Sequence, residues 1–168
     1  MNKIIEATFF SLQQLEEFLQ QLSQEEYTRS LQVYSNSTIG MHTRHVLEFY
    51  QCLLSSSEMN EINYDSRKRN LRLETDIECA LKIAQEIKQQ LVYIKNKPLT
   101  LKMDISMDDK DISVATNIER ELVYLLEHTI HHLAILKMGC IVAFPAVHLH
   151  ANFGVAYSTL KHRNTCVQ

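Results

Sequence analysis

Three of the eight histidines lie in one stretch, 119–138, whose apolar spacing predicts a single helix. They are His128, His131 and His132. Residues four apart lie one above the other on a helix, so His128 and His132 can offer two imidazoles to one metal ion. A lone histidine is more often a core or surface residue, whereas an HxxxH pair in an apolar helix makes metal binding an equally good interpretation. The pair needs a third ligand from elsewhere in the chain.

A second pair, His42 and His45, lies near the start of the stretch 38–54. The polar cluster 35–38 can cap a helix there, and the apolar residues that follow have helical spacing. Residues three apart can point the same way, so both histidines are candidates for the third ligand. We expect His45 to be that ligand, with His42 as the alternative.

Three neutral imidazoles leave at least one coordination position open, which is typical of a catalytic or substrate-binding metal. Imidazole suits Zn²⁺, Ni²⁺, Fe²⁺ and Cu²⁺, so the ligand type alone does not select the metal. An open site would lower the pKa of a bound water, or bind a thiolate and activate it as a nucleophile.

Three further side chains are candidates for a catalytic or binding role. Glu121 lies seven residues before His128 and could act as an acceptor behind a ligand or as a base, although an exposed helix carboxylate is commoner. Arg67 and Arg69 could recognise a carboxylate on a substrate or cofactor. An ion pair of these arginines with one of two carboxylates, Glu74 or Asp76, is an equal alternative.

The charged stretch 60–76 that holds these arginines has two interpretations. It could be a salt-bridged loop that covers an opening or a partner surface. It could equally be a solvent-exposed connection.

The remaining pattern predicts four long helices, a hairpin and a short last helix. The hairpin pairs 99–103 with a return strand at 112–114 through a turn at 107–111. A capping box of Thr116 and Glu119 would open the fourth helix, and Gly139 would end it. The predicted helices span 4–22, about 38–54, 76–95 (capped by Thr75 or Asp76), 116–138 and 155–163, and 23–37 is predicted to be an irregular connection.

We therefore expect an all-α fold, a four-helix bundle with a small β-hairpin before its fourth helix, in one domain spanning residues 1–168. A chain of 168 residues can bury one core, and only three Gly and two Pro favour long helices over a fold of many strands. Sites in such bundles form between facing helices.

Composition argues against several functional classes. A net charge of −3 provides no basic surface for nucleic acid, and the run Arg67-Lys68-Arg69 is too short to change this. The four cysteines are widely spaced, which is typical of reduced thiols in a cytosolic protein. With neither a signal-peptide pattern nor an apolar run of 18 residues, we expect a cytoplasmic protein without a membrane segment.

The chain resembles the DinB-like (DinB/YfiT) superfamily of metal-binding four-helix bundles. The segments that carry the resemblance are TIGMHTRH at 38–45 and EHTIHH at 127–132, with further similar blocks at 63–69 and 153–160. The family pattern, one histidine near the start of the second helix and HxxxH on a later helix, selects His45, His128 and His132 by position. The extra histidines at 42 and 131 keep the choice between His42 and His45 open.

The resemblance implies a divalent metal, Zn or Ni above all, and a homodimer. Fe is a further option because imidazole also suits it. It implies a small-molecule substrate and an enzyme that is a thiol-dependent S-transferase, using a low-molecular-weight thiol, or a hydrolase. A non-enzymatic metal-binding or stress-response dimerisation module is the alternative, and a scaffold that has lost its metal is a third. The family name implies no DNA chemistry.

Overall fold

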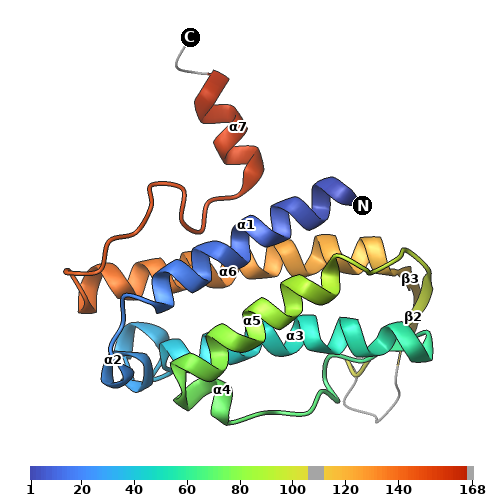
Figure 1. Cartoon of the computed structure of the whole chain (residues 1–168), viewed down its shortest axis with the longest axis horizontal. Helices are drawn as coiled ribbons and strands as arrows, with labels where there is room; N and C mark the ends of the chain where they lie inside the picture. Colours follow the sequence, from blue (N-terminus) through green and yellow to red (C-terminus); the bar gives the residue numbers. More distant parts are fainter. Residues whose placement is uncertain (106–111, 166–168) are drawn as a thin grey trace.

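The computed structural model describes residues 1–105 and 112–165, without the side chains of residues 57, 58 and 164. The described chain is mainly helical and carries a small three-stranded mixed sheet at one end (Figure 1). The expected predominance of helix is confirmed, but "all-α" is too strong because of this sheet. The elements are α1 (Asn2–Leu19), α2 (Gln24–Thr28), η1 (Gln32–Tyr34), α3 (Ile39–Met59), β1 (Glu61–Ile62), α4 (Arg72–Thr75), α5 (Ile77–Leu91), β2 (Pro98–Met103), β3 (Ile112–Asn117), α6 (Ile118–Ala143) and α7 (Tyr157–Thr165).

The four long helices contact one another in pairs. Both α1 and α3 contact α5, and both contact α6. Their apolar stripes meet in one buried cluster, as the helical spacing of the sequence predicts. Leu15, Leu47, Ala84 and Leu133 are at most 1% exposed and represent the four helices in that cluster. This core holds the facing surfaces of α3 and α6 at a fixed separation.

Two helix starts agree with the sequence. The Thr38 hydroxyl accepts the Met41 N–H at 3.0 Å and caps α3. The Asp76 carboxylate accepts the Cys79 N–H at 3.0 Å and caps α5. Each cap satisfies a backbone donor that the first helical turn leaves free.

Both predicted ends of the fourth long helix are wrong. The cap of α6 is Asn117, which accepts the Arg120 N–H at 2.9 Å, while Thr116 belongs to β3. Gly139 lies inside α6, where a Cβ would come within 2.1 Å of the Tyr34 ring. It is therefore needed for the close packing of η1 on α6, and the helix continues to Ala143.

The predicted hairpin is confirmed in its strands. β2 and β3 are antiparallel, with Leu101 opposite Val114. The turn expected at 107–111 lies outside the described residues. β1 pairs with β2 as a parallel strand. It has only two residues, so the alternating apolar pattern of a strand cannot be recognised in its sequence.

Two segments expected to be irregular contain short helices. In the 23–37 connection, the Ser23 hydroxyl and the Glu26 carboxylate form a capping box that opens α2. This motif is visible in the sequence and could have been recognised. In the 60–76 stretch, α4 packs against α3 and α5. The Tyr27 hydroxyl anchors α4 by donating to the Leu73 carbonyl.

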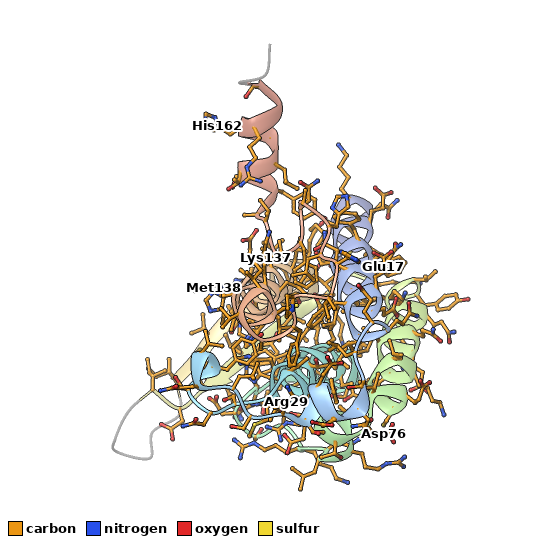
Figure 2. The ribbon with its side chains drawn as sticks, turned by 90° about the vertical axis from the view of Figure 1, so that its left-hand side faces the viewer. Glu17, Arg29, Asp76, Lys137, Met138 and His162 are labelled. Carbon is orange, nitrogen blue, oxygen red and sulfur yellow. The ribbon has the colours of Figure 1, made fainter. Side chains whose placement is uncertain are left out.

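The C-terminal segment extends away from the other helices. Figures 1 and 2 both show α7, which carries His162, projecting from the helical body. Its first residue, Tyr157, donates a hydroxyl hydrogen bond to the Ala7 carbonyl of α1 at 3.1 Å. Over residues 1–105 and 112–165, we find no helix with both the length and the apolar character to cross a membrane. Within the same ranges Cys52, Cys79 and Cys140 have free thiols, and Cys166 lies outside them.

We expect Gly40→Ala to destabilise the protein by ~1–3 kcal/mol, because it overpacks a tight contact. A Cβ at Gly40 would lie 2.1 Å from the Glu74 carbonyl oxygen of α4. Urea unfolding would measure the change. An unconstrained helix gains about 1 kcal/mol from this substitution, so a more stable variant would contradict the contact.

Candidate metal centre

Three histidines from two helices meet between α3 and α6. His45 of α3 and His128 and His132 of α6 each offer a ring nitrogen, and these nitrogens lie within 4.8 Å of one another. The ring centroids of His45 lie 5.0 Å from His128 and 4.8 Å from His132. We call these residues the three-histidine cluster; it is a group that could hold a metal ion.

Burial keeps these imidazoles neutral. Desolvation, reinforced by the neighbouring histidines, lowers the pKa of His132 to about 3. The same cause, together with His128 and Arg67, lowers the pKa of His45 to about 4. The pKa of His128 is also lowered, mainly by desolvation. A neutral imidazole is the form that binds a metal, so the cluster fits a divalent cation in its protonation state.

A hydrogen-bonded chain sets the tautomer of His45. Arg67 Nη2 lies 3.1 Å from His45 Nδ1, and a guanidinium can only donate. His45 Nδ1 is therefore the acceptor, and the proton of the neutral ring is on Nε2. That nitrogen lies 2.9 Å from His128 Nε2, to which it donates. Metal binding through His45 Nε2 would have to displace this proton.

His42 lies behind the cluster. Its Nδ1 is 3.1 Å from His132 Nδ1, so one ring donates to the other. His42 Nε2 is buried and has no hydrogen-bond partner within the described part of the chain. The structure thus groups His45, the preferred third ligand, with the α6 pair, and places His42 where it can orient His132. His131 is exposed on the surface of α6.

Aromatic rings enclose the cluster on the side of His128. The Phe49 ring stacks on His128 at 4.9 Å and on Tyr64 at 4.8 Å. Tyr124 stacks on His128 from α6 at 5.6 Å. The sequence did not single out Phe49 for the site. Its position four residues after His45, at 4.4 Å ring to ring, was the available signal.

Glu121 is fully buried, so the expectation of an exposed carboxylate is wrong. It accepts hydrogen bonds from the Tyr64 hydroxyl at 2.9 Å and the Thr116 hydroxyl at 2.6 Å. Its described partners, which also include Arg120 at 3.1 Å, contain no histidine of the cluster. Burial and the adjacent carboxylate raise the pKa of Tyr64, which stays protonated and donates. Glu121 therefore positions Tyr64, which belongs with Phe49 and Tyr124 to the wall of aromatic rings on the His128 side.

Arg67 is held by a buried carboxylate that the sequence did not single out. Its Nε lies 3.3 Å from the carboxylate of Glu48, a residue of α3 that is 2% exposed. The same guanidinium donates to the Tyr64 carbonyl at 2.8 Å and lies over the Phe49 ring at 4.7 Å. The other Glu48 oxygen accepts the Asn70 N–H at 2.6 Å. Glu48 therefore fixes the loop that carries Arg67 beside His45.

The predicted ion pairs of the arginines with Glu74 or Asp76 are wrong for Arg67. Glu74 pairs with Arg44, and Asp76 pairs with Arg72 at 3.1 Å. Arg72 lies one helical turn before Asp76, and Arg44 lies on α3, which contacts the α4 helix of Glu74. Both carboxylates thus have other partners, and Arg67 pairs with Glu48. Arg69 forms no ion pair with the residues that the structure describes.

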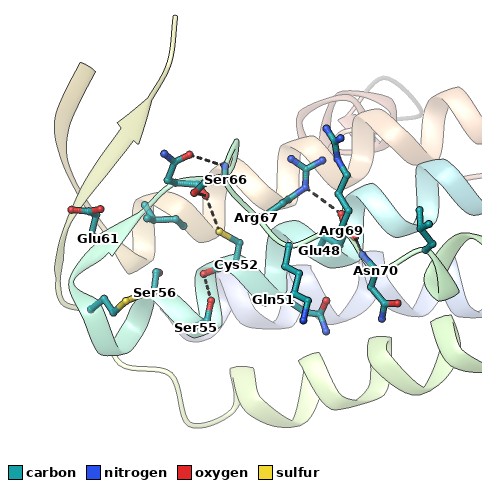
Figure 3. Close-up of a pocket in the computed structure, with 15 residues that line it drawn as sticks. Glu48, Gln51, Cys52, Ser55, Ser56, Glu61, Ser66, Arg67, Arg69 and Asn70 are labelled. Atoms are coloured by element: carbon teal, nitrogen blue, oxygen red, sulfur yellow. Dashed lines mark hydrogen bonds and ion pairs between the residues drawn. The ribbon is translucent and has the colours of Figure 1, made fainter. Parts of the chain in front are cut away.

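One cavity lies beside the cluster rather than over it. It has a volume of about 910 Å³ and lies between α3 and the 61–71 segment (Figure 3). A second cavity, of about 340 Å³, lies between α3 and α5. Neither of these two cavities is lined by a histidine of the cluster, but Arg67 lines the first and also contacts His45. His45 and His128 are half-buried, and His132 is buried.

The comparisons with known proteins do not assign a family. No family model and no solved structure matches the chain. The chain is similar to "FK506-binding protein 5" of Rhizopus delemar, at 35% identity over 113 residues. This match covers 64% of the chain but 29% of the relative. The chain thus matches less than a third of that protein, and the relative's name describes the whole of it.

We expect the free energy of unfolding of the metal-free protein to fall as the pH drops from 6.5 towards 4. The folded chain keeps His45 and His132 neutral, with pKa values of about 4 and about 3, whereas the unfolded chain takes up protons below its ordinary pKa of 6.5. Above that pH both states are neutral and add no slope. Urea unfolding in chelator, at a series of pH values, would measure this dependence.

His132→Gln should reduce that slope by up to about one proton. His150→Gln, at an exposed loop position, is the matched control and should leave the slope unchanged. Equal slopes in all three proteins would show that the buried imidazole of His132 titrates normally.

Proposed function

We propose that this protein is a divalent-metal-dependent enzyme of the DinB/YfiT type that acts on a small molecule. The reaction is a thiol-dependent S-transfer or a hydrolysis. The observation that carries the proposal is the convergence of three neutral histidines, one from α3 and an HxxxH pair from α6. The family assignment and the four-helix bundle belong to this proposal, which is supported by the pairwise contacts among α1, α3, α5 and α6.

The donor set favours Zn²⁺ or Ni²⁺, with Fe²⁺ as a further option, over Ca²⁺ or Mg²⁺, which prefer oxygen ligands. His45, His128 and His132 would hold the ion. When bound with an open position, such an ion acidifies a water or a thiol so that it becomes a nucleophile. A low-molecular-weight thiol is the proposed cofactor for the transfer reaction.

The residues around the cluster have supporting roles in this proposal. A His132 Nδ1–H donated to His42 would leave the other nitrogen of His132 free for an ion and fix the ring orientation. The wall of Phe49, Tyr64 and Tyr124 limits the access of water on the His128 side. Arg67 is the exception, because its positive charge beside His45 opposes the binding of the metal ion.

One observation favours the alternative of a non-enzymatic metal-binding or stress-response module. An enzyme needs a pocket that reaches the metal, and the lining of the 910 Å³ and 340 Å³ cavities includes no histidine of the cluster. The homodimer remains a proposal in both cases. Met138, Ile141 and Val142 on α6 are more than 60% exposed and offer apolar surface for such a contact (Figure 2 labels Met138).

The first test is metal stoichiometry. We expect tag-free protein purified without chelator to bind one Zn²⁺ or Ni²⁺ per chain, and His128→Ala to lose it, because two imidazoles are a much weaker site than three. Elemental analysis and titration of the metal-free protein would measure this. His150→Ala, which removes an exposed loop histidine, should bind like the wild type.

A wild-type protein that takes up no metal on titration would remove the metal-dependent function. Full binding by His128→Ala would remove this residue from the site. If metal binds, turnover of an electrophile with a thiol, measured in the presence and absence of the metal, separates the enzyme from the non-enzymatic module.

Arg67→Gln should raise the affinity for Zn²⁺ by about tenfold. The substitution removes a positive charge 3.1 Å from His45 and lets the ring carry its proton on Nδ1, which frees Nε2. Competition with a chromophoric chelator would measure the affinity. Arg72→Gln is the matched control because that guanidinium is 75% exposed and pairs with Asp76. A lower affinity in Arg67→Gln would mean that Arg67 supports the site by orienting His45.

A further inference from the structure

The 910 Å³ cavity has the size of a small-molecule binding site. One wall is a face of α3, and the other is the 61–71 segment, with Arg67, Arg69 and Asn70 labelled in Figure 3. Lys68 also lines it. Three consecutive basic residues therefore contribute to one cavity wall.

The acidic groups of this cavity are already neutralised. Glu48 is buried and has both oxygens occupied, by Arg67 and by the Asn70 N–H. Glu61 pairs with Lys102 at 2.8 Å. The described acidic side chains of the lining thus leave no unpaired negative charge.

Two basic side chains of the lining have no such partner. Over residues 1–105 and 112–165, the Lys68 ammonium and the Arg69 guanidinium make no ion pair or hydrogen bond, and both residues are exposed. Each can therefore bind an anion without breaking an existing pair. A guanidinium matches the two oxygens of a carboxylate or a phosphate, and an ammonium adds a point charge.

The cavity also offers apolar contact. Met59 and Leu71 line it and are 74% and 62% exposed, so their side chains are available to an organic group. A ligand that combines an anionic head with an apolar body would use both kinds of wall.

We propose that this cavity binds a small organic anion, with its carboxylate or phosphate group held by Lys68 and Arg69. The inference adds a ligand class to the proposed function and depends on that function only for turnover, since binding requires no metal. Arg67 joins the two sites, because it lines the cavity and donates to His45. An anion bound in the cavity would therefore lie near Arg67, whose charge also acts on the cluster.

The test is calorimetric titration of the full-length, metal-free chain at low salt, about 50 mM, where charge interactions are least screened. The probes are phenyl phosphate and benzoate, with inorganic phosphate as the anion without an apolar body and benzamide as the neutral analogue. We expect saturable binding of one phenyl phosphate or benzoate per chain, weaker binding of inorganic phosphate, and none of benzamide.

The double variant Lys68→Gln/Arg69→Gln should weaken phenyl phosphate binding by about tenfold or more. Arg72→Gln/Lys82→Gln removes the same charge from two residues outside the cavity lining, whose side chains are 75% and 76% exposed, and should change it by less than about twofold. Circular dichroism of both variants would establish that they fold. Equal weakening in the two variants, full binding by the first, or no saturable binding by the wild type would each overturn the inference.

A second measurement separates this inference from the proposed function. In histidine NMR spectra, phenyl phosphate should shift the ring nitrogen signals of His45, which Arg67 contacts, and leave those of the exposed His150 unchanged. If the protein binds the anion but takes up no metal, the anion site is supported and the metal-dependent function is contradicted. If it binds metal but no anion, the metal-dependent function keeps its support and the anion site is contradicted.

Discussion

The buried carboxylate of Glu48 is the constraint on which the surroundings of the three-histidine cluster depend. A charge that is 2% exposed is costly unless it is paired and hydrogen-bonded. Glu48 meets this requirement with Arg67 and the Asn70 N–H, both in the 61–71 segment. The pairing ties that segment to α3, places Arg67 against His45 and shapes the cavity on the other side. One buried ion pair therefore links the histidines to the 910 Å³ cavity.

A second buried carboxylate organises the opposite side of the cluster. Glu121 receives the Tyr64 hydroxyl, and Tyr64 in turn stacks on Phe49, which stacks on His128. The stack leaves His128 little rotational freedom. Together the two carboxylates preorganise the histidines before any ligand arrives, at the cost of a cation, Arg67, next to one of them. The site therefore combines a rigid geometry with a charge that weakens metal affinity.

The sequence was most informative where one helix acts alone. The HxxxH spacing, the presence of a cap within 35–38 and at 75–76, and the strands of the hairpin depend on neighbours within a few residues, so local patterns indicated them. The structure selects Thr38 and Asp76 among the candidate caps. Gly139 and Thr116 were misassigned because both are used in contacts with residues distant in the sequence, Gly139 with Tyr34 and Thr116 with Leu99 in the β2–β3 pair. A glycine near the end of an apolar stripe gives the same sequence pattern whether it ends the helix or leaves space for an aromatic ring to pack against the helix.

By itself, the sequence determined a mainly helical chain with two histidine pairs on separate helices, because helical periodicity and i to i+4 spacing are local properties. Only the tertiary structure decided that His45 joins His128 and His132 while His42 lies behind His132. The same holds for the burial of Glu121 and the pairing of Arg67 with Glu48. The physical reason is that the relative rotation of α3 and α6, and the path of the 61–71 segment, follow from the packing of the whole core, which no local pattern encodes.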